Sequence, residues 1–425
     1  MNVLSHRIAL DPTPQQRIAL AKAAGCARKA WNWGLGEWRQ QYAAGGKPSG
    51  PALRKQWNAV KHALYPWMKE SPKDANIEPL FDLEKAFKSF FTGKAKYPRF
   101  KAKGKDRPAF GVSNDKFRTD GKRVRLPVIG WVKMREALRF EGKVLSGRVT
   151  FQGGRWFLSV AVEAAHLRAA ATAGTVGLDL GVETLAVLSD GVVIENSRAL
   201  RSETKRLHRA QLSIARKRRA RDKALGPAKK GERRPVGKNL QKACRKAARV
   251  HARVHAVRSD AIHKATTKIA SSYSTVVVED LNVEGMTRRA KGPGRAAKAA
   301  LNRAILDAGF GEFRRQLTYK LPLHGGTLLV APRFFASSKT CSRCGAVRKH
   351  LSLKERTFTC DSCGYVVHRD LNAAINLRTA GLAGRARRHG VSPEPGTPGA
   401  AIVERLGNQQ EARNDRGGLT SAHVS

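Results

Sequence analysis

The chain has 425 residues, of which 81 are Lys or Arg and 33 are Asp or Glu, so its formal net charge at pH 7 is +48. This excess of cations implies a polyanionic partner, most simply nucleic acid, because self-repulsion on this scale costs stability. No run of ~20 apolar residues could span a membrane and no signal-peptide core begins the chain, which excludes an integral membrane protein. Of the six cysteines, four have metal-ligand spacing and two stand alone. This usage favours a reducing, cytoplasmic setting.

The N-terminal part of the chain predicts one strand followed by helices. Residues 3–10 alternate loosely between apolar and polar side chains, as in a short strand. Thr13 is a good N-cap and Pro14 suits the first position of a helix. Residues 15–92 carry apolar side chains at three- and four-residue spacing, which predicts a helical region. We expect its tryptophans at positions 31, 33 and 38 to fill a helical core rather than stack on bases.

A basic link, rich in Pro and Gly, follows at residues 94–105 and contains Arg99 and Lys101. Short strands are predicted after it, and Gly153-Gly154 is a typical hairpin turn between the last two. The predicted strands are 123–126, 131–134, 148–151 and 156–162. We expect residues 94–168, together with residues 1–10, to form a small β-barrel.

An acidic residue lies inside the apolar strand that follows Gly174. This strand carries Asp179 near its middle, and a hairpin leads to a second strand, 185–188. Burying a carboxylate is costly unless it is paired or binds a cation. Asp179 is therefore either a cation ligand or the partner of a basic neighbour.

Residues 197–272 form a very basic stretch with helical periodicity, interrupted between residues 226 and 237. We expect two antiparallel helices that carry the chain out and back. Charge runs are usually solvated surface, but here few acidic residues balance the cations, which favours contact with phosphates. The predicted phosphate-binding residues are Arg216, Lys217 and Arg218, together with Arg99 and Lys101 of the basic link.

A β-branched strand at residues 275–279 ends in the acidic pair Glu279-Asp280. In an open α/β sheet, functional groups lie at the carboxyl ends of the strands, which is where Glu279 stands. A helix near residues 310–317 and a strand at 327–330 are expected next.

Four cysteines then form two Cys-x-x-Cys pairs, separated by fifteen residues. This spacing lets four thiolates close a tetrahedral shell around one zinc ion. Gly345 and Gly364 follow the two pairs and permit the tight turns that aim backbone amides at the sulfurs. The predicted zinc ligands are Cys341, Cys344, Cys360 and Cys363.

Asp370 precedes a run with helical periodicity at residues 371–377. A carboxylate at this position could simply cap the helix. Together with Asp179 and Glu279, however, it completes a set of three acids that an α/β sheet could bring together. Two Mg²⁺ ions ~4 Å apart require such a set for phosphodiester hydrolysis. The strand–hairpin–strand around Asp179 is typical of an RNase H-like fold. From residue 379 to 425 the chain is predicted to be a disordered tail.

These motifs resemble those of the TnpB family, nucleases of transposable elements that are related to CRISPR type V effectors. Gly177-Leu-Asp179-Leu-Gly181 resembles the first RuvC motif, Val278-Glu279-Asp280-Leu281 the second, and His368-Arg-Asp370-Leu-Asn-Ala-Ala374 the third. The cysteine pairs lie between the second and third, as in that family. Further similarities are Arg28-Lys-Ala-Trp-Asn32, Tyr97-Pro-Arg-Phe-Lys101, Leu126-Pro-Val-Ile-Gly-Trp-Val-Lys133 and Gly309-Phe-Gly-Glu-Phe-Arg314. The segment 226–237 departs from the family in its length and Pro/Gly content.

The resemblance implies a multidomain α/β protein. Its RNase H-like (RuvC) nuclease domain would comprise residues 174–337 and 366–378, with a helical hairpin at 197–272 and a zinc ribbon at 338–365 inserted. A wedge-like β-barrel, 1–10 and 94–168, would hold an inserted helical recognition lobe, 11–93.

By the same resemblance, the protein would be an RNA-guided DNA endonuclease of a prokaryotic transposable element, acting at the nucleoid. Its partners would be a guide RNA from the element's end and double-stranded target DNA. Asp179, Glu279 and Asp370 would hold two catalytic Mg²⁺ ions, and the cysteines one structural zinc. Base pairing would carry sequence recognition, and the protein would supply phosphate contacts. Two alternatives are a transposase that transfers DNA strands and a non-catalytic RNA-guided DNA-binding repressor; the three intact acids argue against the second.

Overall fold

The computed structural model describes residues 2–164, 174–227, 234–289, 292, 294–352 and 354–388. The chain divides into two compact units. The first comprises Met1–His166 and Leu212–Ala252, and the second comprises Leu167–Gln211 and Arg253–Ser425. None of the helices in the described ranges is long and apolar enough to cross a membrane.

The first unit contains a seven-stranded antiparallel sheet. The strand order is β2-β6-β7-β1-β5-β4-β3, so the N-terminal strand β1 lies at its centre. Gly153 and Gly154 form the turn between β6 and β7 with φ angles of 59° and 87°, which confirms the predicted hairpin. Closure of this sheet into a barrel stays a prediction. The strands are β1 (Asn2–Asp11), β2 (Ala109–Ser113), β3 (Arg118–Asp120), β4 (Arg123–Leu126), β5 (Gly130–Met134), β6 (Gly142–Gln152) and β7 (Arg155–Ala164).

Helices α1 (Pro14–Ala43), α2 (Gly50–Leu64) and α3 (Lys73–Phe91) lie between β1 and β2 in the chain, with a short 3₁₀ helix η1 (Pro66–Glu70) before α3. Thr13 caps α1 through a reciprocal capping box with Gln16, as the sequence predicts for Thr13. Trp31 and Trp38 are buried in the core of these helices, and Trp33 packs against it. The aromatic side chains therefore hold the helices together.

The second unit is built on a mixed five-stranded sheet with the order β10-β9-β8-β11-β12. Strand β8 is antiparallel to β9 but parallel to β11, and β11 is parallel to β12. The strands are β8 (Thr175–Leu180), β9 (Thr184–Leu188), β10 (Val193–Glu195), β11 (Thr275–Glu279) and β12 (Thr327–Ala331).

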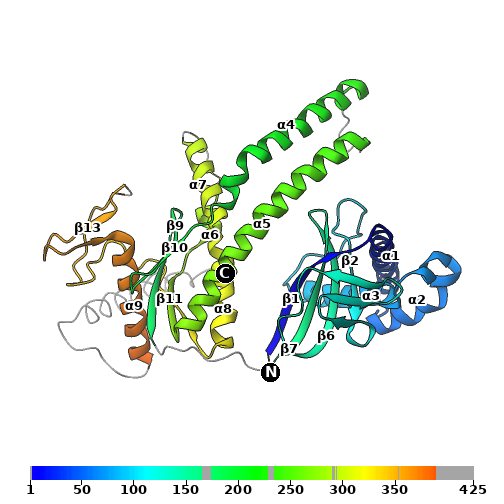
Figure 1. Ribbon diagram of the computed structural model, residues 1–425, viewed down its shortest axis with the longest axis horizontal. Helices are drawn as coiled ribbons and strands as arrows, with labels where there is room; N and C mark the ends of the chain where they lie inside the picture. Colours follow the sequence, from blue (N-terminus) through cyan, green and yellow to red (C-terminus); the bar gives the residue numbers. More distant parts are fainter. Residues whose placement is uncertain are drawn as a thin grey trace, which may run out of the picture. The chain divides into compact units, whose positions relative to one another are not determined.

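Helices cover both faces of this sheet, and Figure 1 shows α8 (Phe310–Leu323) and α9 (Arg369–Arg388) on opposite sides of it. Even-numbered strand residues such as Val176 and Val278 form one core with α5 (Lys238–Ser272), α7 (Arg295–Ala308) and α8. Val277, an odd-numbered residue, forms a second core with α9. The period-two alternation of a strand separates the two faces. The remaining elements are α4 (Ala199–Leu225), α6 (Val283–Met286), β13 (Thr357–Thr359), β14 (Val366–His368) and η2 (Asn114–Lys116).

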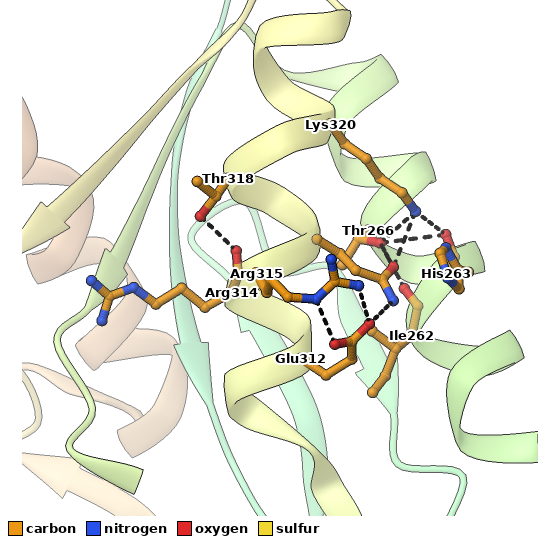
Figure 2. Close-up of polar contacts among 9 residues, drawn as sticks. Ile262, His263, Thr266, Glu312, Arg314, Arg315, Thr318 and Lys320 are labelled. Atoms are coloured by element: carbon orange, nitrogen blue, oxygen red, sulfur yellow. Dashed lines mark hydrogen bonds and ion pairs between the residues drawn. The ribbon is translucent and has the colours of Figure 1, made fainter. Parts of the chain in front are cut away.

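A buried polar network joins α5 to α8 (Figure 2). Lys320 Nζ donates to the His263 carbonyl and to the hydroxyls of Thr266 and Thr267, each at 2.8 Å. Thr266 also donates to Gln316 Oε1 at 2.8 Å. Because the side chains of this network find partners, the polar residues do not weaken the packing behind the sheet.

Two expectations from the sequence need correction. Asp179 lies at the fifth of the six positions of β8 rather than near the middle, so it stands at the strand's carboxyl end. Helix α9 continues to Arg388, so the start of the predicted disordered tail at residue 379 is wrong. The rest of the predicted tail, 389–425, lies outside the described residues.

Candidate active site and zinc-type cysteine cluster

The strands β8 and β11 bring Asp179 and Glu279 to the same end of the sheet. They are parallel, and Leu178 pairs in register with Val278. Asp179 and Glu279 are the next residues along each strand. Neighbouring strands lie ~4.8 Å apart and residues in the same register point to the same face. The two carboxylates therefore project side by side on the face that α9 covers.

Helix α9 brings the third acid to this place. A Cβ atom built on Gly177 would lie 2.0 Å from the carbonyl oxygen of Ala374, so the helix packs directly on the strand's backbone. Asp370 is one helical turn before Ala374, and Asp179 is two residues beyond Gly177. A turn of helix and two residues of strand both span ~5–7 Å. Since the charge of Asp370 raises the pKa of Asp179, the start of α9 points toward the carboxyl end of β8, and Asp370 lies near Asp179.

The electrostatics of Asp179 reflect this arrangement. Burial and then the charges of Asp370 and Glu279 raise the pKa of Asp179 from 3.8 to about 7. Arg369, which lies 3.3 Å from Asp370, lowers the pKa of Asp179 by a smaller amount. Burial also raises the pKa of Glu279. Burial is thus the largest cause of the raised pKa of Asp179, and the neighbouring carboxylates add to it.

Among the described residues, the carboxylates of Asp179 and Glu279 have no hydrogen-bond or ion-pair partner. The cation Arg369 lowers the pKa of Asp179, but its effect is smaller than those of burial, Asp370 and Glu279. Pairing with a basic neighbour therefore does not account for the position of Asp179. A partly exposed cluster of three carboxylates, in which the pKa values of Asp179 and Glu279 are raised, fits a site for a hard cation.

The second member of the acidic pair, Asp280, is engaged elsewhere. Its carboxylate lies 2.7 Å from Arg314 and 2.6 Å from Arg333. The hydrogen bond from Arg314, followed by that from Arg333, lowers the pKa of Asp280. Asp280 thus ties the end of β11 to α8 and to the segment after β12, and Glu279 is left for the site. Sequence reasoning missed the roles of Arg314 and Arg333.

The four predicted cysteine ligands form a cluster. Their sulfurs lie within 4.8 Å of one another, with 3.7 Å between Cys341 and Cys363 and 3.6 Å between Cys344 and Cys360. In the described part of the chain this is the one group of candidate ligands gathered so tightly; the three carboxylates are not drawn together this closely. Four sulfurs at these separations fit a tetrahedral zinc site.

The two cysteine pairs have the same backbone geometry. The Gly345 amide donates to the Cys341 carbonyl at 2.9 Å, and the Gly364 amide donates to the Cys360 carbonyl at 3.0 Å. Both glycines have positive φ angles, 77° and 67°, which explains the need for glycine there. Backbone amides also hydrogen-bond to the sulfurs of Cys341 and Cys360, as predicted.

The predicted nucleic-acid contacts fall into different environments. Arg99 has a side chain that is 75% exposed and is paired with Asp106. The Lys101 ammonium lies 3.5 Å from the centre of the Trp31 ring, and burial lowers its pKa to about 8. Lys101 therefore has a packing role that the sequence did not suggest. The other three predicted residues, Arg216, Lys217 and Arg218, are exposed on α4.

Two of the motifs that resemble the TnpB family, 28–32 and 97–101, are joined by hydrogen bonds. Trp31 Nε1 donates to the Arg99 carbonyl at 3.0 Å. Asn32 donates to the Lys101 carbonyl at 2.9 Å and accepts from its amide at 2.7 Å. These bonds fix the basic link against α1.

Comparison with known families gives three matches. A model described as "Probable transposase" matches residues 158–290, and "Cas12f1-like, TNB domain" matches residues 310–377. A model described as "Helix-turn-helix domain" matches residues 1–47, where the structure has strand β1 and the single long helix α1.

Two of the similar proteins cover nearly the whole chain, and a third covers a shorter part. "Putative RNA-guided DNA endonuclease InsQ" of Escherichia coli (strain K12) is 33% identical over 385 residues, which are 88% of this chain and 91% of that protein. "Putative RNA-guided DNA endonuclease" of Streptomyces pristinaespiralis is 35% identical over 396 residues, 90% of each chain. "TnpB-like protein L79" of Acanthamoeba polyphaga mimivirus is 29% identical over 123 residues, 29% of this chain and 22% of that protein.

Among solved structures, the Cas12f1 chain of a complex with guide RNA and target DNA matches with a TM-score of 0.50 and 16% identity. The match covers 85% of this chain and 83% of that chain. Fold and site thus define a multidomain α/β protein whose fold resembles that of Cas12f1 and whose four clustered cysteines fit a zinc site. The chain belongs to the TnpB family.

Proposed function

We propose that the protein is an RNA-guided DNA endonuclease of a transposable element, which hydrolyses target DNA in a RuvC-like site. The observation that carries this proposal is the placement of Asp179, Glu279 and Asp370 around one end of β8 and β11. The names of the two full-length relatives, both described as RNA-guided DNA endonucleases, support it.

Asp179, Glu279 and Asp370 would hold two Mg²⁺ ions, which the set of oxygen donors fits. Bound there, the ions would stabilise the charge that develops on the scissile phosphate and lower the pKa of the attacking water. Asp179 must release its proton before it can serve as a ligand, and its raised pKa makes this step pH-dependent. Arg369, in contact with Asp370, offsets part of the negative charge of the cluster.

The net charge of +48 supports nucleic-acid partners. We propose a guide RNA from the element's end and double-stranded target DNA, with Arg99, Arg216, Lys217 and Arg218 among the phosphate contacts. A guide–target duplex held through its backbone gives a steep salt dependence with little sequence preference from the protein itself. One zinc ion would be bound by the four cysteines.

The test is to express the protein with and without the end of its own element and to incubate each preparation with plasmids that carry a matched or a mismatched target. We expect double-strand cutting with RNA, Mg²⁺ and a match, and none when one of these is missing. Equal cutting by RNA-free protein would contradict the proposal that an RNA guides the cleavage. Strand joining without hydrolysis would indicate a transposase, and guided binding without cutting would indicate a repressor.

A further inference from the structure

Two asparagines connect the helix of Asp370 to the first cysteine pair. Asn372 Oδ1 accepts from the Ser342 amide at 3.0 Å, and its Nδ2 donates to the Thr340 carbonyl at 2.7 Å. Asn376 Nδ2 donates to the Thr340 carbonyl at 2.6 Å and to the Ser337 carbonyl at 2.8 Å. Ser342 lies between Cys341 and Cys344, so the first of these bonds reaches into the loop that presents the sulfurs.

The two asparagines are buried. Asn372 is 0% exposed and Asn376 is 1% exposed, and they stand one helical turn apart on α9. Removal of Asn372 would take this partner from the Ser342 amide, and removal of Asn376 would take it from the buried Ser337 carbonyl, while the Thr340 carbonyl would keep one of its two donors. The loss of a partner by a buried group is more costly than the loss of an exposed hydrogen bond. The position of α9 and the conformation of the first cysteine pair are therefore interdependent.

The second cysteine pair is joined to the same helix at its start. Strand β14 pairs with β13 next to this cysteine pair and runs directly into α9. The Arg369 amide donates to the Arg356 carbonyl at 2.7 Å. The side chain of Arg356 is also paired with Glu183, at 2.6 Å, in the hairpin that follows Asp179. The cysteine-bearing segment therefore contacts the chain beside two of the three acids.

We propose that the zinc-bound cysteine segment sets the position of Asp370 through Asn372 and Asn376, so that zinc retention and Mg²⁺ binding at the acid cluster are coupled. The two asparagines are positioning residues: neither carries a metal-binding charge, and both act through the placement of the helix. The inference rests on the proposed function of the three acids. Coupling between two sites is reciprocal, so each metal strengthens retention of the other.

The first measurement is zinc release from the full-length protein to a colorimetric chelator, with and without Mg²⁺. In the wild type we expect Mg²⁺ to slow the release. In Asn372→Ala and Asn376→Ala, zinc leaves between about 10- and 100-fold faster, a loss typical of residues that orient metal ligands, and Mg²⁺ no longer has an effect. Thr379→Ala is the matched control, because the hydrogen bond that the Thr379 side chain makes to the described residues stays within α9, to the Ile375 carbonyl at 3.1 Å.

The second measurement is the Mg²⁺ concentration that gives half-maximal plasmid cleavage. We expect it to rise at least several-fold in both asparagine variants, with guide RNA binding unchanged, and to stay at the wild-type value in Thr379→Ala. Asn376→Ala retains Asn372 and so tests the link if Asn372→Ala does not fold. Zinc release and the Mg²⁺ midpoint both unchanged in a folded asparagine variant would overturn the inference. If the wild type does not cut DNA, the proposed function fails, while zinc release still tests the coupling.

Discussion

Gly177 on β8 and Ala374 on α9 are in direct backbone contact: a Cβ atom on Gly177 would lie 2.0 Å from the Ala374 carbonyl oxygen and 2.5 Å from the Arg378 amide nitrogen. Gly381 makes a similar approach to β11, since its Cβ would lie 2.4 Å from Val277 Cγ2. The two glycines let α9 lie on the strands that carry Asp179 and Glu279. The close approach of α9 to these strands, which brings Asp370 toward the other two acids, therefore depends on residues without side chains.

Gly177→Ala should consequently displace α9 and abolish DNA cleavage. The backbone atoms opposite cannot rotate away as a flexible side chain could, so we expect a loss of stability of at least about 1–3 kcal/mol. Thermal unfolding and plasmid cleavage measure the two effects. Gly174→Ala is the matched control, because a Cβ at that position meets nothing within 4 Å. Normal cleavage by the Gly177→Ala protein would show that α9 need not approach this closely.

The adjacent acids Glu279 and Asp280 should respond differently to neutral substitution. Glu279→Gln removes a carboxylate of the cluster and should abolish cleavage without loss of stability, because Glu279 has no partner among the described residues. Asp280→Asn weakens the pairs with Arg314 and Arg333 and should lower the melting temperature, with cleavage still detectable. Cleavage assays and thermal melts of the two proteins, compared side by side, test the assignment. The opposite pattern would make Asp280 the catalytic acid.

The three acids could be predicted from the sequence, but the contacts that position them could not. Asp179 could be selected as an acid inside an apolar strand, and Glu279 as an acid at the end of one. Asp370 taken alone could be a helix cap, so it could be selected only together with the other two acids. The cysteine spacing predicts its own geometry. The roles of Asn372 and Asn376 could not be predicted, since a buried asparagine in a helix has no distinctive pattern until its partners in another segment are known. Their spacing of four residues beside Asp370 was the available signal. The packing of Lys101 on Trp31 is likewise a tertiary contact, which a basic run alone does not reveal.

The raised pKa of Asp179 predicts a pH dependence for the Mg²⁺ requirement. Because the pKa of Asp179 is about 7, this carboxyl group is protonated at lower pH and must lose its proton before it can bind a cation. The Mg²⁺ concentration for half-maximal cleavage should therefore rise about tenfold for each pH unit below 7 and level off above it. Titrations of cleavage between pH 5.5 and pH 8.5, on the order of one per half unit, measure this. A midpoint that does not change with pH would mean that Asp179 is already charged.

The raised pKa of Asp179 also predicts how the folding stability of the metal-free protein depends on pH. The ordinary pKa of an Asp side chain is 3.8, and that of Asp179 in the folded protein is about 7. At pH values between these two, the folded state keeps a proton on Asp179 that the unfolded state has lost. Its contribution to stability therefore falls as the pH rises through this window, and it is constant above it. Asp179→Asn should remove this part of the pH dependence and raise the melting temperature at pH 8 without Mg²⁺. Melts of the two proteins at several pH values give the comparison.

Replacement of one cysteine of the cluster should cause loss of zinc and of local structure in the cysteine-bearing segment. Cys360→Ser should release zinc and loosen the cysteine segment, because metal binding supplies much of the folding free energy of so small a structure. Elemental analysis measures the zinc, and limited proteolysis near residues 338–365 measures the loosening. Cys244→Ser is the control, because Cys244 is a free cysteine outside the cluster. Wild-type protein without zinc would remove the basis of the prediction.

The exposed cations of α4 provide a test of the phosphate contacts. Replacement of Arg216, Lys217 and Arg218 by Ala should weaken guide RNA binding and reduce the slope of log K against log salt concentration by about 2 to 3, since each phosphate contact contributes nearly one unit. Removal of three charges also lowers the overall attraction, so the control must lose the same charge elsewhere. Lys47, Arg54 and Lys55, at and near the start of α2, are likewise exposed, and their joint replacement by Ala serves this purpose. Filter binding at several salt concentrations compares the two proteins. Equal losses would mean that net charge, rather than contact through α4, accounts for the affinity.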